Sequence, residues 1–131
     1  MILDTNYLIA VDSGDTGAVE KARELESTDR PLRIPTVVIH EIYRAVGMSG
    51  RPNDDADRYE KFFSSCPVVP LDENIARRAG VLDGKSMASD SSKSLDVADA
   101  VIAATGLVHN EAVVSDDSDL MAVDGLEVET Y

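Results

Sequence analysis

The chain is poor in the residues that build disulfides and zinc sites. Its 131 residues include one cysteine, Cys66, and two histidines, His40 and His109. A single thiol excludes an intrachain disulfide and a multi-cysteine zinc site, and two histidines are too few for a histidine-rich centre. His40-Glu41 begins like the zinc-protease pattern, but Arg44 stands where the second histidine must be. We expect Cys66 to be a buried, unreactive thiol.

Long apolar runs are also missing. None approaches the roughly 18 residues of a membrane span, because Asp4 interrupts the apolar stretch at residues 1–3, and no secretion signal is visible. Hydrophobic residues still make up 44% of the sequence and are spread along it, which is enough for a buried core. We therefore expect a single domain over residues 1–131, without a membrane segment and located in the cytoplasm.

Positive charge and aromatic side chains are scarce as well. Twelve Lys and Arg residues face 25 Asp and Glu residues, which gives a net charge of −13, and aromatic residues make up 5% of the chain. Asp outnumbers Glu by 16 to 9, and Arg outnumbers Lys by 8 to 4. This composition resembles that of haloarchaeal proteins, whose acidic surfaces are screened at high salt, where the Debye length at 1 M is about 3 Å. It excludes a broad basic surface for nucleic acid, although not nucleic acid as a partner.

Short apolar runs alternate with segments of helical period along the chain. This alternation predicts an α/β fold with a central parallel sheet of about five short strands. We expect the strands at residues 1–3, 32–34, 68–69, 112–115 and 126–131, and the helices at residues 16–26, 36–48, 54–63, 72–82 and 95–107. Thr36 and Asp72 are the expected N-caps of two of these helices, Gly84 is an expected helix stop, and residues 85–94 are an expected surface loop.

Acidic residues follow two of the expected strands. Asp4 ends the first strand, and the strand at residues 112–115 is followed by Asp116, Asp117 and Asp119. Ligands of doubly wound sheets bind at the carboxyl ends of the strands. One carboxylate after a strand is often only a cap or a turn residue. Two such sites on one sheet favour a functional role.

Two further acids lie on helix faces that should pack inward. Glu41 has the apolar neighbours Val37, Val38 and Ala45, and Asp99 lies among Leu95, Ile102 and Ala103. A buried charge without compensation costs several kcal/mol, so a cation or a hydrogen-bond network is expected at each acid. A structural ion pair with Arg44 is an alternative explanation for Glu41. Asp96, one turn before Asp99, is explained equally well as a helix cap.

Together these positions bring at least four carboxylates to one end of the sheet, with no cysteine and no suitable histidine. All-oxygen ligation of this kind suits one or two Mg²⁺ or Mn²⁺ ions rather than Zn²⁺. Such ions polarise a phosphodiester and lower the pKa of a bound water. The pattern therefore indicates phosphodiester hydrolysis.

Two other phosphate chemistries fit the sequence less well. The segment Gly80-Val-Leu-Asp-Gly-Lys-Ser86 looks like a phosphate-binding loop, but it has three residues between its glycines where four are required, and a helical pattern precedes it. Aspartyl-phosphate phosphatases need a second Asp where Asn6 stands. Response-regulator receivers need a lysine after a late strand, whereas the last lysine here, Lys93, precedes the penultimate strand.

Four segments, in order, resemble the successive motifs of PIN-domain nucleases. They are Met1-Ile-Leu-Asp-Thr-Asn-Tyr-Leu-Ile9, Ile39-His-Glu-Ile-Tyr-Arg44, Asp99-Ala-Val-Ile-Ala-Ala-Thr105 and Val113-Val-Ser-Asp-Asp-Ser-Asp-Leu120. The resemblance covers nearly the whole chain. It implies a three-layer α/β/α domain and an Mg²⁺- or Mn²⁺-dependent endoribonuclease that uses activated water. The likeness is strongest to VapC-type toxin ribonucleases, which implies a small antitoxin partner and a homodimer.

Carried over by position, the resemblance places the catalytic acids at Asp4, Glu41, Asp99 and Asp117, all of them metal ligands, with Asp119 as a further ligand. The residues that would support this site are Thr5, Asn6, Asp96, Ser115 and Asp116. The family often has a basic or polar residue at the position of Asp116 and an aromatic one at that of Leu120, so the choice of metal ligand among the three acids after residue 115 stays open. Two alternatives also remain: a PIN nuclease of rRNA or RNA processing without an antitoxin, and an inactive module that binds RNA or protein.

Overall fold

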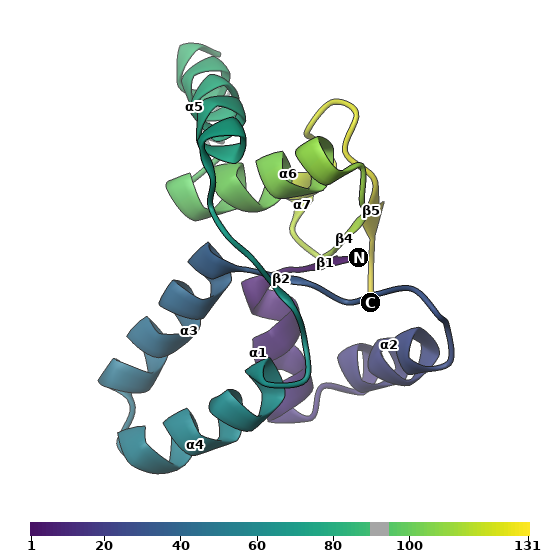
Figure 1. Ribbon diagram of the computed structural model, residues 1–131, viewed down its shortest axis with the longest axis vertical. Helices are drawn as coiled ribbons and strands as arrows, with labels where there is room; N and C mark the ends of the chain where they lie inside the picture. The colour runs from purple at the N-terminus through teal and green to yellow at the C-terminus, as the bar shows by residue number, and fades with distance from the viewer. Residues whose placement is uncertain (90–94) are drawn as a thin grey trace.

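Five parallel strands of two residues each form the centre of the computed structural model (Figure 1), which describes residues 1–89 and 95–131. They are β1 (Ile2–Leu3), β2 (Ile34–Pro35), β3 (Val68–Val69), β4 (Val113–Val114) and β5 (Val128–Glu129). One sheet has the order β1-β4-β5 and the other pairs β2 with β3. A bridge between Ile2 and Arg33 joins the two sheets, so the strands follow one another in space as β3-β2-β1-β4-β5.

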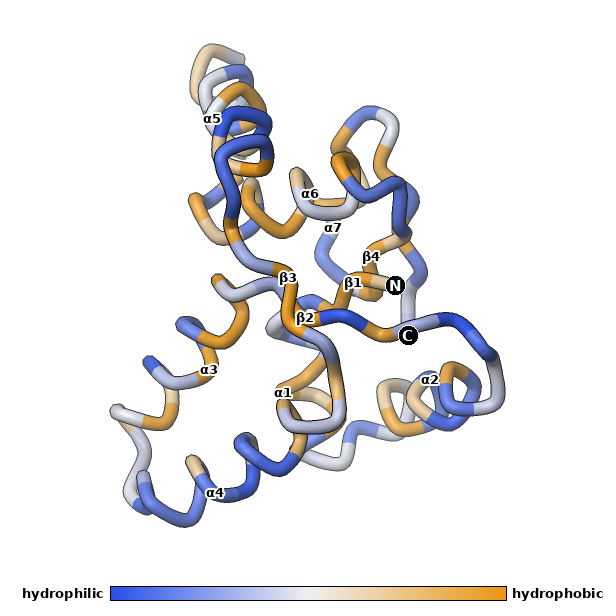
Figure 2. Tube along the Cα trace, in the orientation of Figure 1, coloured by the Kyte–Doolittle hydropathy of each residue, from blue (hydrophilic) through white to orange (hydrophobic). Residues whose placement is uncertain are grey.

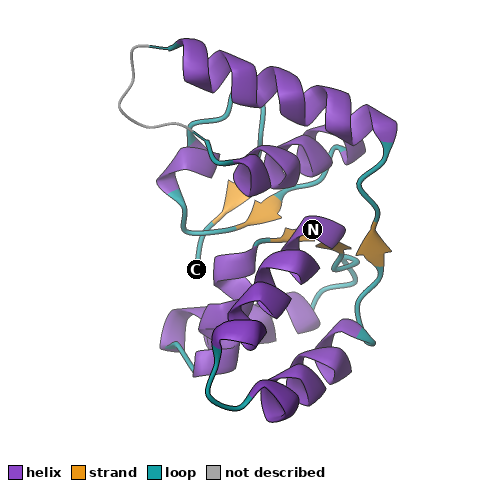
Figure 3. Ribbon diagram, turned by 90° about the vertical axis from the view of Figure 1, so that its left-hand side faces the viewer, coloured by secondary structure: helices purple, strands orange, loops and turns teal. Residues whose placement is uncertain are grey.

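Helices cover both sides of these strands. Those on one side are α1 (Thr5–Ser13), α2 (Thr16–Glu26), α3 (Thr36–Met48) and α4 (Pro52–Phe63); those on the other are α5 (Glu73–Ala88), α6 (Val97–His109) and α7 (Ser118–Met121) (Figures 1 and 3). This arrangement confirms the expected three-layer α/β/α architecture. None of the helices in the described part of the chain has both the length and the apolar character that a membrane span requires.

The core lies on both sides of the strands, and a large part of it is where α6 packs on the central strands. All residues of α6 from Ala100 to Gly106 are buried, as are both residues of β1 and of β4. The trace is correspondingly orange along β1 and β4 in Figure 2, whereas α4 is mostly blue. A Cβ atom on Gly106 would lie 2.8 Å from Leu126 Cδ1, so the absence of a side chain lets α6 approach closely. The burial of each large aliphatic side chain in this layer contributes about 1.5–3 kcal/mol, and the packing fixes the first turn of α6.

Two helical segments differ from the sequence predictions. Helix α1 begins directly after β1, whereas the first helix expected from the sequence was at residues 16–26. Asp4 is its N-cap in extended conformation, and its carbonyl accepts a hydrogen bond from the Leu8 N–H at 3.2 Å. Helix α5 continues to Ala88, so Gly84 does not end it. A glycine inside a helix costs about 1 kcal/mol, which the packing of α5 against α6 offsets. The remainder of the expected loop, residues 90–94, lies outside the described residues.

The expected N-caps give a mixed result. The Asp72 carboxylate accepts a hydrogen bond from the Ile75 N–H at 2.9 Å, which confirms it as the cap of α5. Thr36, in contrast, is the first residue of α3 and follows the N-cap Pro35. Its hydroxyl accepts a hydrogen bond from the Leu71 N–H at 3.1 Å and so joins α3 to the segment after β3.

Candidate active site

Asp4 is a buried carboxylate at the carboxyl end of β1. Its side chain is only 2% exposed, and Oδ2 accepts a hydrogen bond of 2.6 Å from the hydroxyl of the buried Ser115. The parallel register pairs Leu3 with Val114, so the residues that follow β1 and β4 lie side by side. Burial raises the pKa of Asp4 to about 6, the hydrogen bond from Ser115 opposes this shift, and the charges of Asp117 and Glu41 add to it.

Glu41 is held mainly by a hydrogen bond and not by an ion pair. The Thr5 hydroxyl at the start of α1 donates to Glu41 Oε1 at 2.6 Å and so links α1 to α3. Arg44 Nη2 lies 3.9 Å from Glu41 Oε2, and the Arg44 side chain is 66% exposed. An exposed pair at this distance contributes little. Arg44 therefore leaves most of the Glu41 charge uncompensated.

Asp99 lies in the first turn of α6, among the other acids. Burial, together with the charges of Asp96, Asp117, Asp4 and Glu41, raises its pKa to about 7. Asp96 is the N-cap of this helix, since its Oδ1 accepts a hydrogen bond of 2.8 Å from the Asp99 N–H. The helix-cap explanation of Asp96 is thus confirmed. Within the described part of the chain, no hydrogen bond or ion pair gives the Asp99 carboxylate a comparable structural role.

Asp117 is joined to Asp4 through the Ser115 hydroxyl. That hydroxyl donates to Asp4 and accepts a hydrogen bond of 3.0 Å from the Asp117 N–H. Asp117 also caps α7, because its Oδ1 accepts a hydrogen bond of 2.8 Å from the Asp119 N–H. Its charge acts on both Asp4 and Asp99. Asp117 therefore links the end of β4 to both of these carboxyls.

Tyr131 borders the site, and the sequence analysis did not select it. Its ring packs against Tyr7 with 5.1 Å between centroids. Burial raises the pKa of its phenol, and so do the charge of Asp116 and a hydrogen bond to that carboxylate. Val114 pairs with Glu129. Asp116 and Tyr131, each two residues further along the chain, therefore lie at equivalent positions after their strands. No signal in the sequence marked this position, because the expected last strand, residues 126–131, includes Tyr131, whereas the observed strand ends at Glu129.

The other predicted site residues are Asn6, Asp116 and Asp119. Asp116 is exposed and held by Tyr131, and Asn6 is exposed on the first turn of α1. Asp119 lines a cavity of about 510 Å³ between α5 and α7, together with Arg78 and Lys85. The structure therefore brings together Asp4, Glu41, Asp99 and Asp117, with Thr5, Ser115 and Asp96 as their hydrogen-bonding neighbours.

The donor chemistry of this acid cluster, defined as Asp4, Glu41, Asp99 and Asp117, fits a hard divalent cation. All the available donors are carboxylate oxygens, the ligands that Mg²⁺ and Mn²⁺ prefer. Within residues 1–89 and 95–131, however, no three acidic, histidine or cysteine side chains are already arranged to hold a metal ion. The carboxylates repel one another, and hydroxyl or N–H groups hold three of them. Ion binding therefore requires the acids to approach one another.

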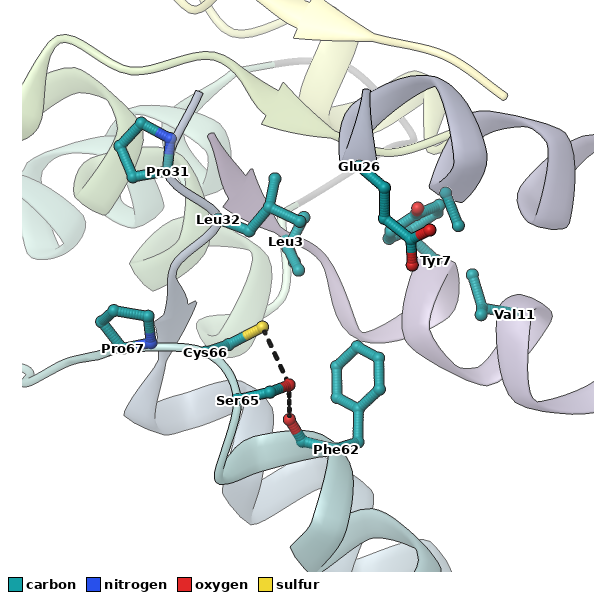
Figure 4. A pocket seen from close by; sticks show the side chains of 11 residues that line it. Leu3, Tyr7, Val11, Glu26, Pro31, Leu32, Phe62, Ser65, Cys66 and Pro67 are labelled. Atoms are coloured by element: carbon teal, nitrogen blue, oxygen red, sulfur yellow. Dashed lines mark hydrogen bonds between the residues drawn. The ribbon is translucent and has the colours of Figure 1, made fainter. Parts of the chain in front are cut away.

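A second cavity, of about 400 Å³, lies on the α1–α4 side of the strands (Figure 4) and contains none of the four acids. Its lining is mainly apolar and includes Leu3, Tyr7 and Phe62. Cys66 also faces it, with Sγ 3.9 Å from the Ser65 hydroxyl. The prediction of a buried thiol was wrong in degree, because Cys66 is only partly buried.

The fold and the site together define a class of protein: a three-layer α/β domain with interacting carboxylates gathered where its strands end. The family model described as PIN domain matches residues 1–126. The chain therefore belongs to the PIN-domain family, as the four motifs predicted. No curated protein matched the chain in sequence.

Solved structures with the same fold cover nearly the whole chain. The DNA-bound VapBC2 structure from Rickettsia felis is 16% identical, with a TM-score of 0.85, and the match covers 99% of this chain and 97% of that one. DNA-bound VapBC from Salmonella typhimurium is 20% identical, with a TM-score of 0.83 and coverages of 98% and 96%. Mycobacterium tuberculosis VapC20, described as a sarcin-ricin loop cleaving toxin, is 16% identical, with a TM-score of 0.72 and coverages of 98% and 98%. These likenesses show a shared fold.

Proposed function

We propose that residues 1–131 form one Mg²⁺- or Mn²⁺-dependent endoribonuclease domain with Asp4, Glu41, Asp99 and Asp117 as its active site. The observation that carries this proposal is the interaction of four carboxylates from separate parts of the chain. Burial first, and then the charges of the neighbouring acids, raise the pKa of Asp4 to about 6 and that of Asp99 to about 7. Strongly perturbed acids in one place are typical of functional sites. Membership of the PIN-domain family supports the same conclusion.

A bound divalent ion would supply a water of lowered pKa and would neutralise charge on the phosphodiester. The chain's own residues supply the remaining functions. The four acids would hold the ion by their carboxylate oxygens, and Asp119 is a further candidate ligand. Ser115 and Thr5 orient Asp4 and Glu41 through their hydroxyl groups. Asp96 fixes the backbone from which the Asp99 side chain projects.

Cleavage of single-stranded RNA is expected to need Mg²⁺ or Mn²⁺, to stop in EDTA and to resume when the metal is restored. The products should carry 5′-phosphate and 3′-hydroxyl ends, because water attacks the phosphorus while the 3′ oxygen departs. Gel analysis of an RNA labelled at either end, followed by phosphatase and ligase treatment, identifies both ends. Products that end in 2′,3′-cyclic phosphate, or undiminished cleavage in EDTA, would overturn this mechanism.

We further propose that the protein is the toxin of a toxin–antitoxin pair and acts on RNA in the cytoplasm. The structures it resembles include VapBC complexes from two organisms and a toxin that cleaves the sarcin-ricin loop. A nuclease of rRNA or RNA processing without an antitoxin is the alternative if cleavage occurs and no partner exists. An inactive binding module is the alternative if RNA binds without being cleaved.

The native protein is expected to be a homodimer that copurifies with a small antitoxin, and the antitoxin should suppress cleavage. The physical reason is that a basic side chain of the partner, inserted among the four acids, would compete with the metal for the same carboxylates. Light scattering of the isolated chain and mass spectrometry of the native complex test the two parts. A monomer that copurifies with no small protein contradicts this assignment and leaves the cleavage test unaffected.

A further inference from the structure

A cavity of about 320 Å³ opens beside the acid cluster, between α3 and the first turn of α6. Glu41 lines it from α3 and Asp96 from α6. The opposing walls also carry Val37 and Val97, and Val97 is 69% exposed although it is aliphatic. The volume is at the lower end of the range for small-ligand sites. The cavity therefore offers apolar walls next to the carboxylates.

Two side chains that can bind phosphate line the same cavity. His40 and Arg44 come from α3 at a spacing of four residues, which places them on one face of the helix, and both are exposed. Arg44 is a cation with little competition for its charge, since its one ion pair among the described residues is the 3.9 Å approach to Glu41. Several other cations are closely paired; Lys21, for example, lies 2.9 Å from Glu129 and Arg58 2.5 Å from Asp12.

The location of this charge matters because the surface is strongly acidic. With a net charge of −13 the chain has no broad basic surface to attract a polyanion, so RNA must be held by a few cations near the site. The guanidinium fork matches the geometry of a phosphate. The apolar walls suit the faces of a ribose or a base, which need no charge.

We propose that this cavity binds one nucleotide of the RNA strand beside the scissile bond, with its backbone phosphate on Arg44 and its ribose or base against Val37 and Val97. His40 provides a second hydrogen-bond donor toward the same phosphate. This assignment rests on the proposed nuclease function and adds to it a substrate subsite. It makes Arg44 a binding residue and not the structural counterion of Glu41.

Arg44→Ala is expected to raise the KM for a single-stranded RNA about tenfold and to change kcat by less than about twofold, because one charged hydrogen bond to substrate is lost. Arg44→Lys, which keeps the charge, should recover part of the loss. The matched control is Arg77→Ala on α5. Arg77 is an equally exposed helix arginine, 63% against 66%, and it also pairs with a glutamate on its own helix. Arg77→Ala removes the same charge at a position outside the cavity, and the KM of this variant should stay at the wild-type value.

RNA affinity measured by fluorescence anisotropy in an Asp4→Asn background separates binding from cleavage. Arg44→Ala in this background should reduce the slope of log affinity against log salt by about 1, whereas Arg77→Ala should not. Equal effects of the two substitutions, or a fall in kcat with unchanged KM and salt slope, would overturn the subsite. A wild-type chain that binds RNA through Arg44 without cleaving it supports the subsite and contradicts the nuclease function. If the wild type cleaves RNA and Arg44→Ala behaves like Arg77→Ala, the nuclease function is supported and the subsite is contradicted.

Discussion

Asp4→Asn, Glu41→Gln and Asp99→Asn are each expected to reduce metal-dependent RNA cleavage by at least a hundredfold, the scale of a lost metal ligand or base. Each amide keeps the size of the acid and one acceptor oxygen, so Asn at residue 4 still accepts the hydrogen bond from Ser115. What disappears is a negative charge that holds the ion. The loss should therefore appear in catalysis while the fold persists.

The measurement is the initial rate of cleavage of a labelled single-stranded RNA at saturating Mn²⁺, with circular dichroism of each variant to confirm the fold. Asp57→Asn on the exposed side of α4 is the control, because it removes the same charge from a residue outside the cluster. Its rate should equal that of the wild type. Retained activity in all three cluster variants would remove the proposed active site.

The layered fold was predictable because its signals are local. Apolar pairs such as Ile2–Leu3 and Val113–Val114 sit between helical periods, and that alternation alone indicates buried parallel strands. Helix α1 was not predicted because it begins immediately after β1, with no loop residues to separate the strand pattern from the helix pattern. Asp4-Thr5-Asn6 has the composition of a turn, yet the burial of Tyr7 and Leu8 makes it the start of a helix.

The acids were predictable from the cost of burying charge, and their contacts were not. Glu41 and Asp99 stood out because their helical neighbours are apolar, which is unusual without compensation. Which neighbour compensates depends on the packing of separate elements: Thr5 reaches Glu41 across α1 and α3, and Ser115 joins Asp4 to Asp117. Such contacts join residues up to 111 positions apart and leave no periodic signal.

The metal-free protein should become less stable as pH rises from about 4 to about 7. Burial and the surrounding carboxylates raise the pKa of Asp99 from 3.8 to about 7. Between these two values the folded chain binds more protons than the unfolded chain, so a rise in pH favours unfolding. The loss of stability begins above the pKa that Asp99 has in the unfolded chain and is complete above the pKa that it has in the folded chain. The raised pKa of Asp4 acts in the same direction up to about 6.

Asp99→Asn removes this cost and is therefore expected to be more stable than the wild type in EDTA at pH 8, by about 1 kcal/mol after allowance for solvent screening. At pH 4 the two proteins should differ little, because Asp99 is then protonated in the wild type. Asp57→Asn is again the control, since an exposed aspartate on α4 should change neither the stability nor its pH dependence.

Bound metal should invert the order of the two stabilities. A ligand at about one hundred times its dissociation constant stabilises the folded state by about 2.7 kcal/mol, and Asp99→Asn gains less because it lacks one of the carboxylates. Thermal melts of both proteins at one fixed high salt concentration, at pH 4 and pH 8 in EDTA and at pH 8 in excess Mn²⁺, provide the comparison. If Asp99→Asn is the less stable protein at pH 8 in EDTA, the Asp99 carboxylate stabilises the fold through hydrogen bonds. The repulsion from which the metal site is inferred would then be absent.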